Sequence, residues 1–326
     1  MRTPILAAGT MVLGLSFPPT TQASTYDEPW QDQVIREADS LVKIRIEANE
    51  GGKIVRFELL DQLAGEPVPQ AGVIDDFDRV SIRNPHWEFH HQPDDVGYAL
   101  LRKTEDGDWS LPTPSTGWAA LEDGQVAATY RHSYHMALVP DPVYRSTTTA
   151  LFKHLHGQPW DEQAMGAFID KWLAEPPQSP SGEEQGETFF HQHVALECFH
   201  HLGSDTELTR LEPFLALDDF HVRVSAVRAL SRIDNPATRQ RLLAILADEA
   251  WPGFPRVMAA WGLERLDARE LLPRLQELIP TMAEVETGFG GNIMDPRIGT
   301  AFPHTVKKAA EALVEAWATV EAPAPE

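Results

Sequence analysis

Histidine is the residue type with the clearest potential for chemistry in this chain of 326 residues, which contains 13 histidines. His86, His90 and His91 lie with Trp87 in one short segment, and the imidazole ring is a common ligand of zinc. The segment does not match the zinc motif HExxH, because Glu88 stands two positions after the first histidine instead of next to it. His86, His90 and His91 are therefore candidate metal ligands for an alternative function, in which the β-rich part of the chain forms a metal-binding protein or a hydrolase.

Motifs of nucleophilic catalysis and of cofactor binding are missing from the sequence. It contains no GxSxG elbow, and Gly288-Phe289-Gly290-Gly291 is not followed by the Lys-Ser or Lys-Thr of a phosphate-binding loop. The single cysteine, Cys198, lies among apolar residues of a predicted helix, which indicates a position in the core. The sequence thus predicts no catalytic residue and no cofactor, and it favours a function other than catalysis.

Four arginines occupy matching positions in a segment that occurs twice, 33 residues apart. Residues 222–234 read VRVSAVRALSRID, and residues 255–267 read PRVMAAWGLERLD. The alignment places Arg223 on Arg256 and Arg232 on Arg265. Two interpretations stay open: these arginines pair with Asp234 and Asp267 to lock adjacent repeats, or they form a ladder of cations that faces an acidic partner.

Self-similarity at this period is typical of a solenoid of stacked helix pairs, in which each pair buries its apolar face against its neighbours. The pattern of residues 222–233, with Val-Arg followed by Ala, Ala, Leu and Ile at helical spacing, resembles the HEAT-type repeat family. The resemblance covers residues 187–318, and helical patterning begins near residue 147. We therefore predict an all-α HEAT-like solenoid over residues 147–318. Solenoids of this kind mostly bind other macromolecules, so the resemblance implies a protein or peptide partner.

Residues 26–146 are predicted to form a small β-barrel or sandwich, because short β-branched segments alternate with turns rich in Gly, Asp and Pro. The expected strands are 40–48, 53–65, 80–84, 96–103, 108–112 and 125–132. Ala38-Asp39, Leu63-Ala64-Gly65 and Gly97-Tyr98-Ala99-Leu100 resemble motifs of the OB-type barrel in netrin-like domains. The predicted fold class is α+β multidomain, with this domain before the solenoid. An OB-like barrel also allows an alternative function as an inhibitor or a carbohydrate binder.

A long insertion interrupts the helical pattern at residues 286–304. It contains four glycines and several apolar residues, and insertions between solenoid helices lie on one face of the solenoid, which is often the binding face. The alternative is a structural cap over the last helix pair. If the insertion binds a partner, Phe289, Asp295 and Arg297 are the candidate contact residues.

The first 23 residues have the features of a secretory signal peptide, with Arg2 before an apolar run and Thr21-Gln22-Ala23 at the expected cleavage site. The run is too short to span a bilayer, so we expect a periplasmic or secreted protein without stable membrane insertion after cleavage. Residues 319–326 are expected to form a disordered tail.

The net charge of −22 argues against a nucleic-acid partner. The sequence as a whole predicts an exported scaffold whose HEAT-like solenoid binds a protein or peptide partner in the cell envelope.

Overall fold

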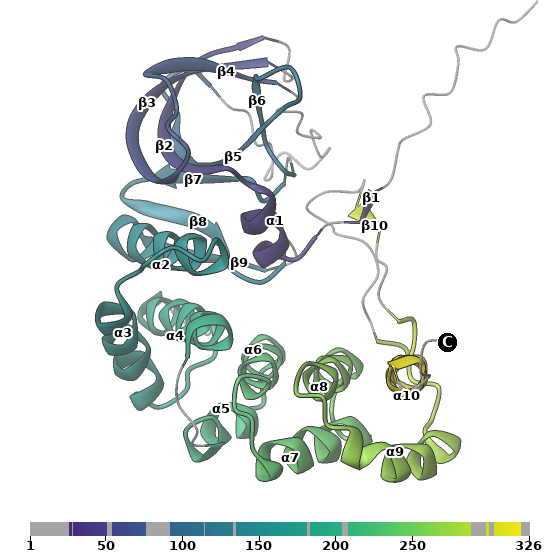
Figure 1. Ribbon diagram of the computed structural model, residues 1–326. Coiled ribbons are helices and arrows are strands. Elements are labelled where there is room, and N and C mark those ends of the chain that lie inside the picture. Colours follow the sequence, from purple (N-terminus) through teal and green to yellow (C-terminus); the bar gives the residue numbers. More distant parts are fainter. Residues whose placement is uncertain are drawn as a thin grey trace, which may run out of the picture.

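The computed structural model describes residues 26–27, 29–50, 54–75, 92–113, 115–132, 135–180, 183–203, 208–287, 298–299 and 303–320. These residues form a five-stranded mixed β-barrel with extra strands, followed by nine α-helices (Figure 1). The order of a β-barrel before a helical region, and the α+β class, agree with the prediction from the sequence.

Five strands close the barrel: β2 (Ser40–Glu50), β3 (Ile54–Gly65), β4 (Ala71–Asp75), β5 (Val96–Lys103) and β6 (Trp109–Ser110). Their order around the barrel is β2-β3-β4-β6-β5, and β5 pairs back onto β2. β4 and β6 are parallel, whereas the other neighbours are antiparallel. The strand predicted over 80–84 lies outside the described residues, and β4 was not predicted.

Alternation of side chains along the strands separates two apolar layers. In β2, Val42 and Ile44 point into the barrel, where they pack with residues such as Phe57. Leu41 and Tyr98 point the other way and join the core of the helical region. The barrel is therefore filled from one face of its strands and is attached to the helices by the other.

Three strands extend the sheet beyond the barrel: β7 (Trp118–Glu122), β8 (Gln125–Thr129) and β9 (Met136–Pro140). β7 pairs with β5, β8 with β7, and β9 with β8. The helix α1 (Gln31–Glu37) lies beneath the barrel, on the side that faces the helical region (Figure 1). The two-residue strands β1 (Tyr26–Asp27) and β10 (Ile298–Gly299) pair in parallel and bring together segments far apart in the sequence.

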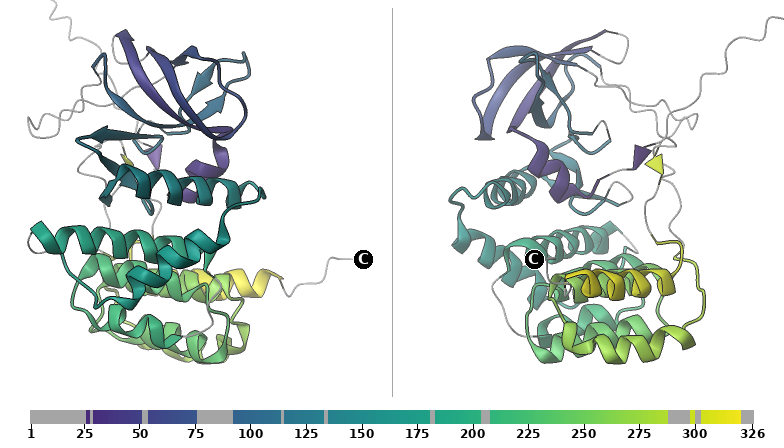
Figure 2. Two further views of the ribbon diagram at one scale, coloured as in Figure 1. Left: turned by 90° about the vertical axis from the view of Figure 1, so that its left-hand side faces the viewer. Right: turned by 45° about the vertical axis from the view of Figure 1, so that its right-hand side comes forward.

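The helical region consists of two rows (Figure 1). The row nearer the barrel, which we call the inner row, contains α2 (Asp141–Leu155), α4 (Glu183–Leu202), α6 (Phe220–Leu230), α8 (Gly253–Arg265) and α10 (Val306–Val320). The other row contains α3 (Glu162–Ala174), α5 (Glu212–Ala216), α7 (Pro236–Ala247) and α9 (Leu272–Leu278). Figure 2 gives two further views of this layering. No helix in the described part of the chain is long and apolar enough to cross a bilayer.

Local sequence signals determine where several of these helices begin. The side chains of Asp161, Asp219 and Asn235 each accept a hydrogen bond from a backbone N–H in the first turn of α3, α6 and α7.

Prolines account for two corrections to the predicted elements. The helix expected over 205–219 is instead a 3₁₀ turn at Leu208–Arg210 followed by the short α5, because Pro213 favours a helix start.

The helix expected over 268–285 is likewise divided into α9 and two flanking 3₁₀ turns, Arg269–Leu271 and Ile279–Thr281. Pro273 and Pro280 stand at the start of two of these pieces, where a missing backbone N–H costs least. The inner helices are more regular. In α6 and α8, the matching pairs Ala226 with Ala259 and Leu230 with Leu263 are fully buried.

A single apolar core connects the two regions. It contains residues from the outer face of the barrel, such as Leu100, and from every helix of the inner row, as far as Trp317 of α10. The predicted domain boundary between residues 146 and 147 falls within α2.

Candidate functional site

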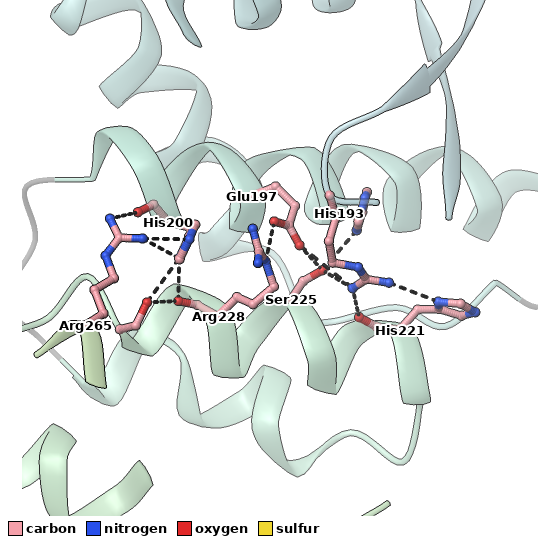
Figure 3. Close-up of polar contacts among 9 residues, drawn as sticks. His193, Glu197, His200, His221, Ser225, Arg228 and Arg265 are labelled. Carbon is pink, nitrogen blue, oxygen red and sulfur yellow. Dashed lines mark hydrogen bonds and ion pairs between the residues drawn. The ribbon is translucent and has the colours of Figure 1, made fainter. Parts of the chain in front are cut away.

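The most concentrated polar chemistry lies on one face of α4. His193, Glu197 and His200 are spaced i, i+4 and i+7 along this helix, so they share one side of it (Figure 3). The facing residues of α6 and its C-terminal end follow a similar spacing: Ser225, Arg228 and Ser231. Two helices that pack through their small and apolar residues therefore also enclose a line of polar side chains, which we call the polar seam.

Glu197 is the centre of the seam and is completely buried. Its carboxylate accepts hydrogen bonds from Ser225 Oγ at 2.7 Å and from Arg228 Nε at 3.0 Å. Arg131, which follows β8, places Nη1 3.8 Å from the same carboxylate and donates to Ser225 Oγ at 2.9 Å. Burial lowers the pKa of Arg131 to about 10, while Glu197 favours its charged form. The guanidinium of Arg228 also lies 4.4 Å from the ring centroid of Trp30.

Three histidines surround the Arg131 end of the seam. The ring of His135 lies 4.2 Å from that of His193 and 4.3 Å from that of His221, between centroids. Burial lowers the pKa of His135 and of His193 well below the usual range, and the charge of Arg131 lowers them further. Burial likewise lowers the pKa of His221 to about 4. These rings are therefore neutral at pH 7, which avoids further positive charge beside the two arginines.

The combination of Ser225, His193 and Glu197 has the residue types of a catalytic triad but not its arrangement. The Ser225 hydroxyl donates to Glu197, so His193 Nδ1, at 3.1 Å, donates to Ser225 Oγ rather than accepting its proton. Ser225 and Glu197 are both fully buried, which leaves no space for a substrate. The neighbouring Cys198 is also buried, and burial raises the pKa of its thiol. The inner part of the seam therefore joins the β8–β9 segment to α4 and α6.

At the outer end of the seam, the buried His200 contacts the exposed Arg265. Its Nδ1 donates to the Arg228 carbonyl at 2.7 Å, which fixes Nε2 as the acceptor of Arg265 Nη1, also at 2.7 Å. Arg265 Nη2 donates to the His200 carbonyl at 3.2 Å. Burial and the nearby arginines hold the pKa of His200 well below its usual range, so the neutral ring that this geometry requires is present at pH 7.

Three exposed arginines, Arg36, Arg232 and Arg265, gather where the inner helices end, and we call them the basic edge. Each donates a hydrogen bond to a backbone carbonyl at or just beyond the end of a neighbouring helix: Arg36 to Leu155, Arg232 to Gly203 and Arg265 to His200. Their charges act together on His154. Burial lowers the pKa of this residue, and all three arginines lower it further.

A cavity of about 530 Å³ adjoins the basic edge. Trp160, Met165, Phe199 and Leu202 form much of its apolar wall. Its polar lining residues are His154, Glu162, Asp170, Arg210 and Arg232. Arg210 pairs with Asp170 at 2.8 Å, so this pair is internally neutralised, and Arg232 remains as a charged group at the cavity. The cavity thus offers apolar surface together with hydrogen-bond donors and acceptors.

The other two arginines of the predicted ladder are not on this edge. Arg223 pairs with Asp218 at 2.8 Å and lies over Trp251. Arg256 is completely buried and donates through Nε to the Leu246 carbonyl, while its two terminal nitrogens have no hydrogen-bond partner.

The predicted pairing of the four arginines with Asp234 and Asp267 is replaced by more local contacts. Asp234 pairs with Arg239 at 2.6 Å, and Asp267 pairs with Arg269 at 2.6 Å. Each of these arginines lies two to five residues from its aspartate in the sequence, so the contact needs no stacking of repeats.

The other predicted site residues lie outside the described part of the chain. They are His86, His90 and His91 in the β-rich domain, and Phe289, Asp295 and Arg297 in the insertion. Among the residues that are described, no group of three or more His, Cys, Asp or Glu side chains is arranged to hold a metal ion.

Sequence reasoning missed Glu197, Arg131 and Arg228. Two signals were available: a glutamate within the apolar stretch 194–199, and the exchange of Ser225 and Arg228 for apolar residues in the second copy of the repeat. Arg131 gave no signal, because its contacts on α6 are about 90 residues away in the sequence.

Comparisons with protein families, with curated proteins and with solved structures found no match for this chain. The argument for its function therefore depends on its own residues.

Proposed function

We propose that this chain is an exported scaffold that binds a protein or peptide partner through its helical region. The observation that carries the proposal is the basic edge. The chain has 49 acidic and 27 basic residues, yet Arg36, Arg232 and Arg265 are exposed together, and no described carboxylate lies within ion-pair distance of them. Asp32 of α1 stabilises the charge of Arg265 from beyond ion-pair distance, so the three arginines are only partly compensated. A cationic patch of this kind on an acidic protein attracts an acidic partner.

A HEAT-like repeat is part of the proposal. The buried alanines and leucines at matching positions of α6 and α8 support it, as does the packing of α4, α6 and α8 side by side in one row (Figure 1). The large buried fraction of α6 and α8 leaves little of their length for contact with a partner. The ends of these helices, where Arg232 and Arg265 lie, are the part that remains exposed.

The proposal is tested by capture of partners from a cell-envelope extract on the immobilised protein, with identification by mass spectrometry. A variant with Arg232→Gln and Arg265→Gln should lose the partner, and captured partner should fall as salt is raised. Arg274→Gln is the matched control, since Arg274 is an exposed arginine of α9 that pairs with Glu277. Absence of any enriched protein with the unaltered chain would reject the scaffold function.

The same capture experiment tests the insertion. A variant with alanine at Phe289, Asp295 and Arg297 should lose the partner if the insertion contributes to binding. Retention of the partner by this variant, together with its loss from the double arginine variant, would assign binding to the basic edge alone.

A second candidate places binding on the barrel, in agreement with the OB-type resemblance. The closed five-stranded order supports it, and so do Ile54 and Leu60, two large apolar residues of β3 that are each 37% exposed. Exposed apolar side chains on a small barrel suit an inhibitor or a carbohydrate binder. Leu60→Glu should abolish binding if the barrel carries the function and should leave it unchanged if the basic edge does.

A further inference from the structure

The arginines of the basic edge differ from most others in this chain. Arg45, Arg56, Arg145 and Arg241 each form an ion pair with a glutamate or an aspartate at the surface. In the basic edge, the hydrogen bonds go to backbone carbonyls instead and, for Arg265, also to the ring of His200. A guanidinium carries five N–H donors, so an arginine that uses one or two of them on a carbonyl keeps the rest, and its full charge, for a ligand.

Arg232 connects the basic edge to the cavity. Its Nε donates to the Gly203 carbonyl at 2.6 Å, and Arg232 and Gly203 both line the cavity. The apolar wall begins immediately beside this point, because Phe199 and Leu202 belong to the same turn of α4 that ends at Gly203. Phe199 and Leu202 are nearly completely buried, so the apolar surface that a ligand on Arg232 would meet is mainly that of the half-buried Trp160.

The lining of the cavity discriminates between kinds of anion. Glu162 and Asp170 lie in the same cavity as Arg232 and His154. Asp170 is neutralised by Arg210, so Glu162 is the carboxylate that would repel a phosphate with two negative charges more strongly than a single carboxylate. A peptide presents single carboxylates that can bind Arg232 and backbone N–H groups that can donate to the carboxylates of the lining. Its apolar side chains can contact the apolar wall, so a peptide suits both kinds of lining residue.

We propose that the basic edge and its cavity form a binding site for an acidic peptide segment of the partner. Carboxylates of the segment bind Arg36, Arg232 and Arg265, and one apolar side chain enters the cavity between Trp160 and Phe199. The volume of about 530 Å³ is within the range of known ligand sites. This inference rests on the proposed function and names the class of ligand that the scaffold recognises.

A glycine in the wall of the cavity permits a direct test. Gly166 lies in the middle of α3, and a Cβ added there meets no heavy atom within 4 Å. Gly166→Leu would fill the cavity from inside a helix that gains stability when glycine is replaced. Gly186 of α4 has equally free space and does not line the cavity, so Gly186→Leu is the matched control.

The probe is a fluorescein-labelled ten-residue peptide that alternates Glu and Leu, and its Gln-for-Glu analogue measures the contribution of charge. Fluorescence anisotropy with the full chain should give a Kd that rises about tenfold or more for the variant with Arg232→Gln and Arg265→Gln. Gly166→Leu should weaken binding by a similar factor, and Gly186→Leu should leave the Kd unchanged. Gly166→Leu also keeps the test decisive if loss of the two arginines, which hold helix carbonyls, lowers the melting temperature.

Two results would overturn the inference: equal affinity for the Gln analogue, or an unchanged Kd for Gly166→Leu. If a protein is captured from the extract while the acidic peptide does not bind, this inference fails and the scaffold function stands. If neither binds, both fail.

Discussion

Replacement of Glu197 by glutamine should destabilise the protein by about 3–5 kcal/mol, because it removes the carboxylate that pairs with two buried arginines in the polar seam. Glu197 is fully buried, and Arg131 and Arg228 are 3% and 9% exposed. Glutamine has nearly the same shape, so packing around the site is kept and the change isolates the charge. The carbonyl of the glutamine can still accept one hydrogen bond, but the two guanidinium groups would share a buried site without a paired carboxylate.

The free energy of unfolding is measured by urea denaturation with linear extrapolation, monitored by circular dichroism. Glu58→Gln is the control, because Glu58 pairs with Arg45 at the surface, where the side chains are 37% and 42% exposed. Exposed pairs contribute less than about 1 kcal/mol. A loss for Glu197→Gln that is no larger than the loss for Glu58→Gln would refute the view that the seam depends on this carboxylate.

Acidification should weaken the fold: buried histidines have lowered pKa values, so below pH 6.5 the unfolded chain binds more protons than the folded one. Each such histidine should lower the free energy of unfolding by about 1.4 kcal/mol per pH unit below pH 6.5, as measured by denaturation at pH 7.5 and 5.5. The histidines concerned are His135, His193, His200 and His201. Gly97→Ala should cost about 1–3 kcal/mol, since its Cβ would lie 2.4 Å from the Trp118 ring; Gly166→Ala, with free space, should cost nothing. Arg256→Met should be neutral or stabilising in the same denaturation assay, because two buried guanidinium nitrogens lack partners; a loss above about 2 kcal/mol would contradict this.

The architecture could be predicted because its signals are local. Strands β2, β3 and β5 are long and alternate or cluster β-branched residues. Helices α6 and α7 begin at side-chain caps, and α6 and α8 share a repeated core pattern. The short strands β4, β7 and β9 were missed. Each is five residues long and gains its stability from a neighbour in the sheet, which the local sequence does not encode.

Equivalent positions in a repeat do not have equivalent partners, and this limited the prediction of the site. Arg223 has Asp218 five residues before it, and the corresponding residue before Arg256 is Trp251. The exchange of an aspartate for a tryptophan leaves Arg256 without an ion pair to a described carboxylate, and Glu249 and Asp248 act on its charge only from a greater distance. Arginines aligned by sequence can therefore be a surface ion pair in one copy and a buried, incompletely bonded group in the next.

The two ends of the polar seam differ in their exposure to solvent, and they therefore have different roles. At the buried end, Arg131 and Glu197 satisfy each other and hold the β8–β9 segment against the helices, so a ligand has nothing to reach. At the other end, Arg265 is held through His200 and the end of α4, and no described carboxylate forms an ion pair with it. The same helix face thus supplies rigidity at one end and an oriented cation at the other. A guanidinium held in this way loses little further conformational entropy when it binds a carboxylate, which favours recognition at the basic edge over the flexible arginines elsewhere on the surface.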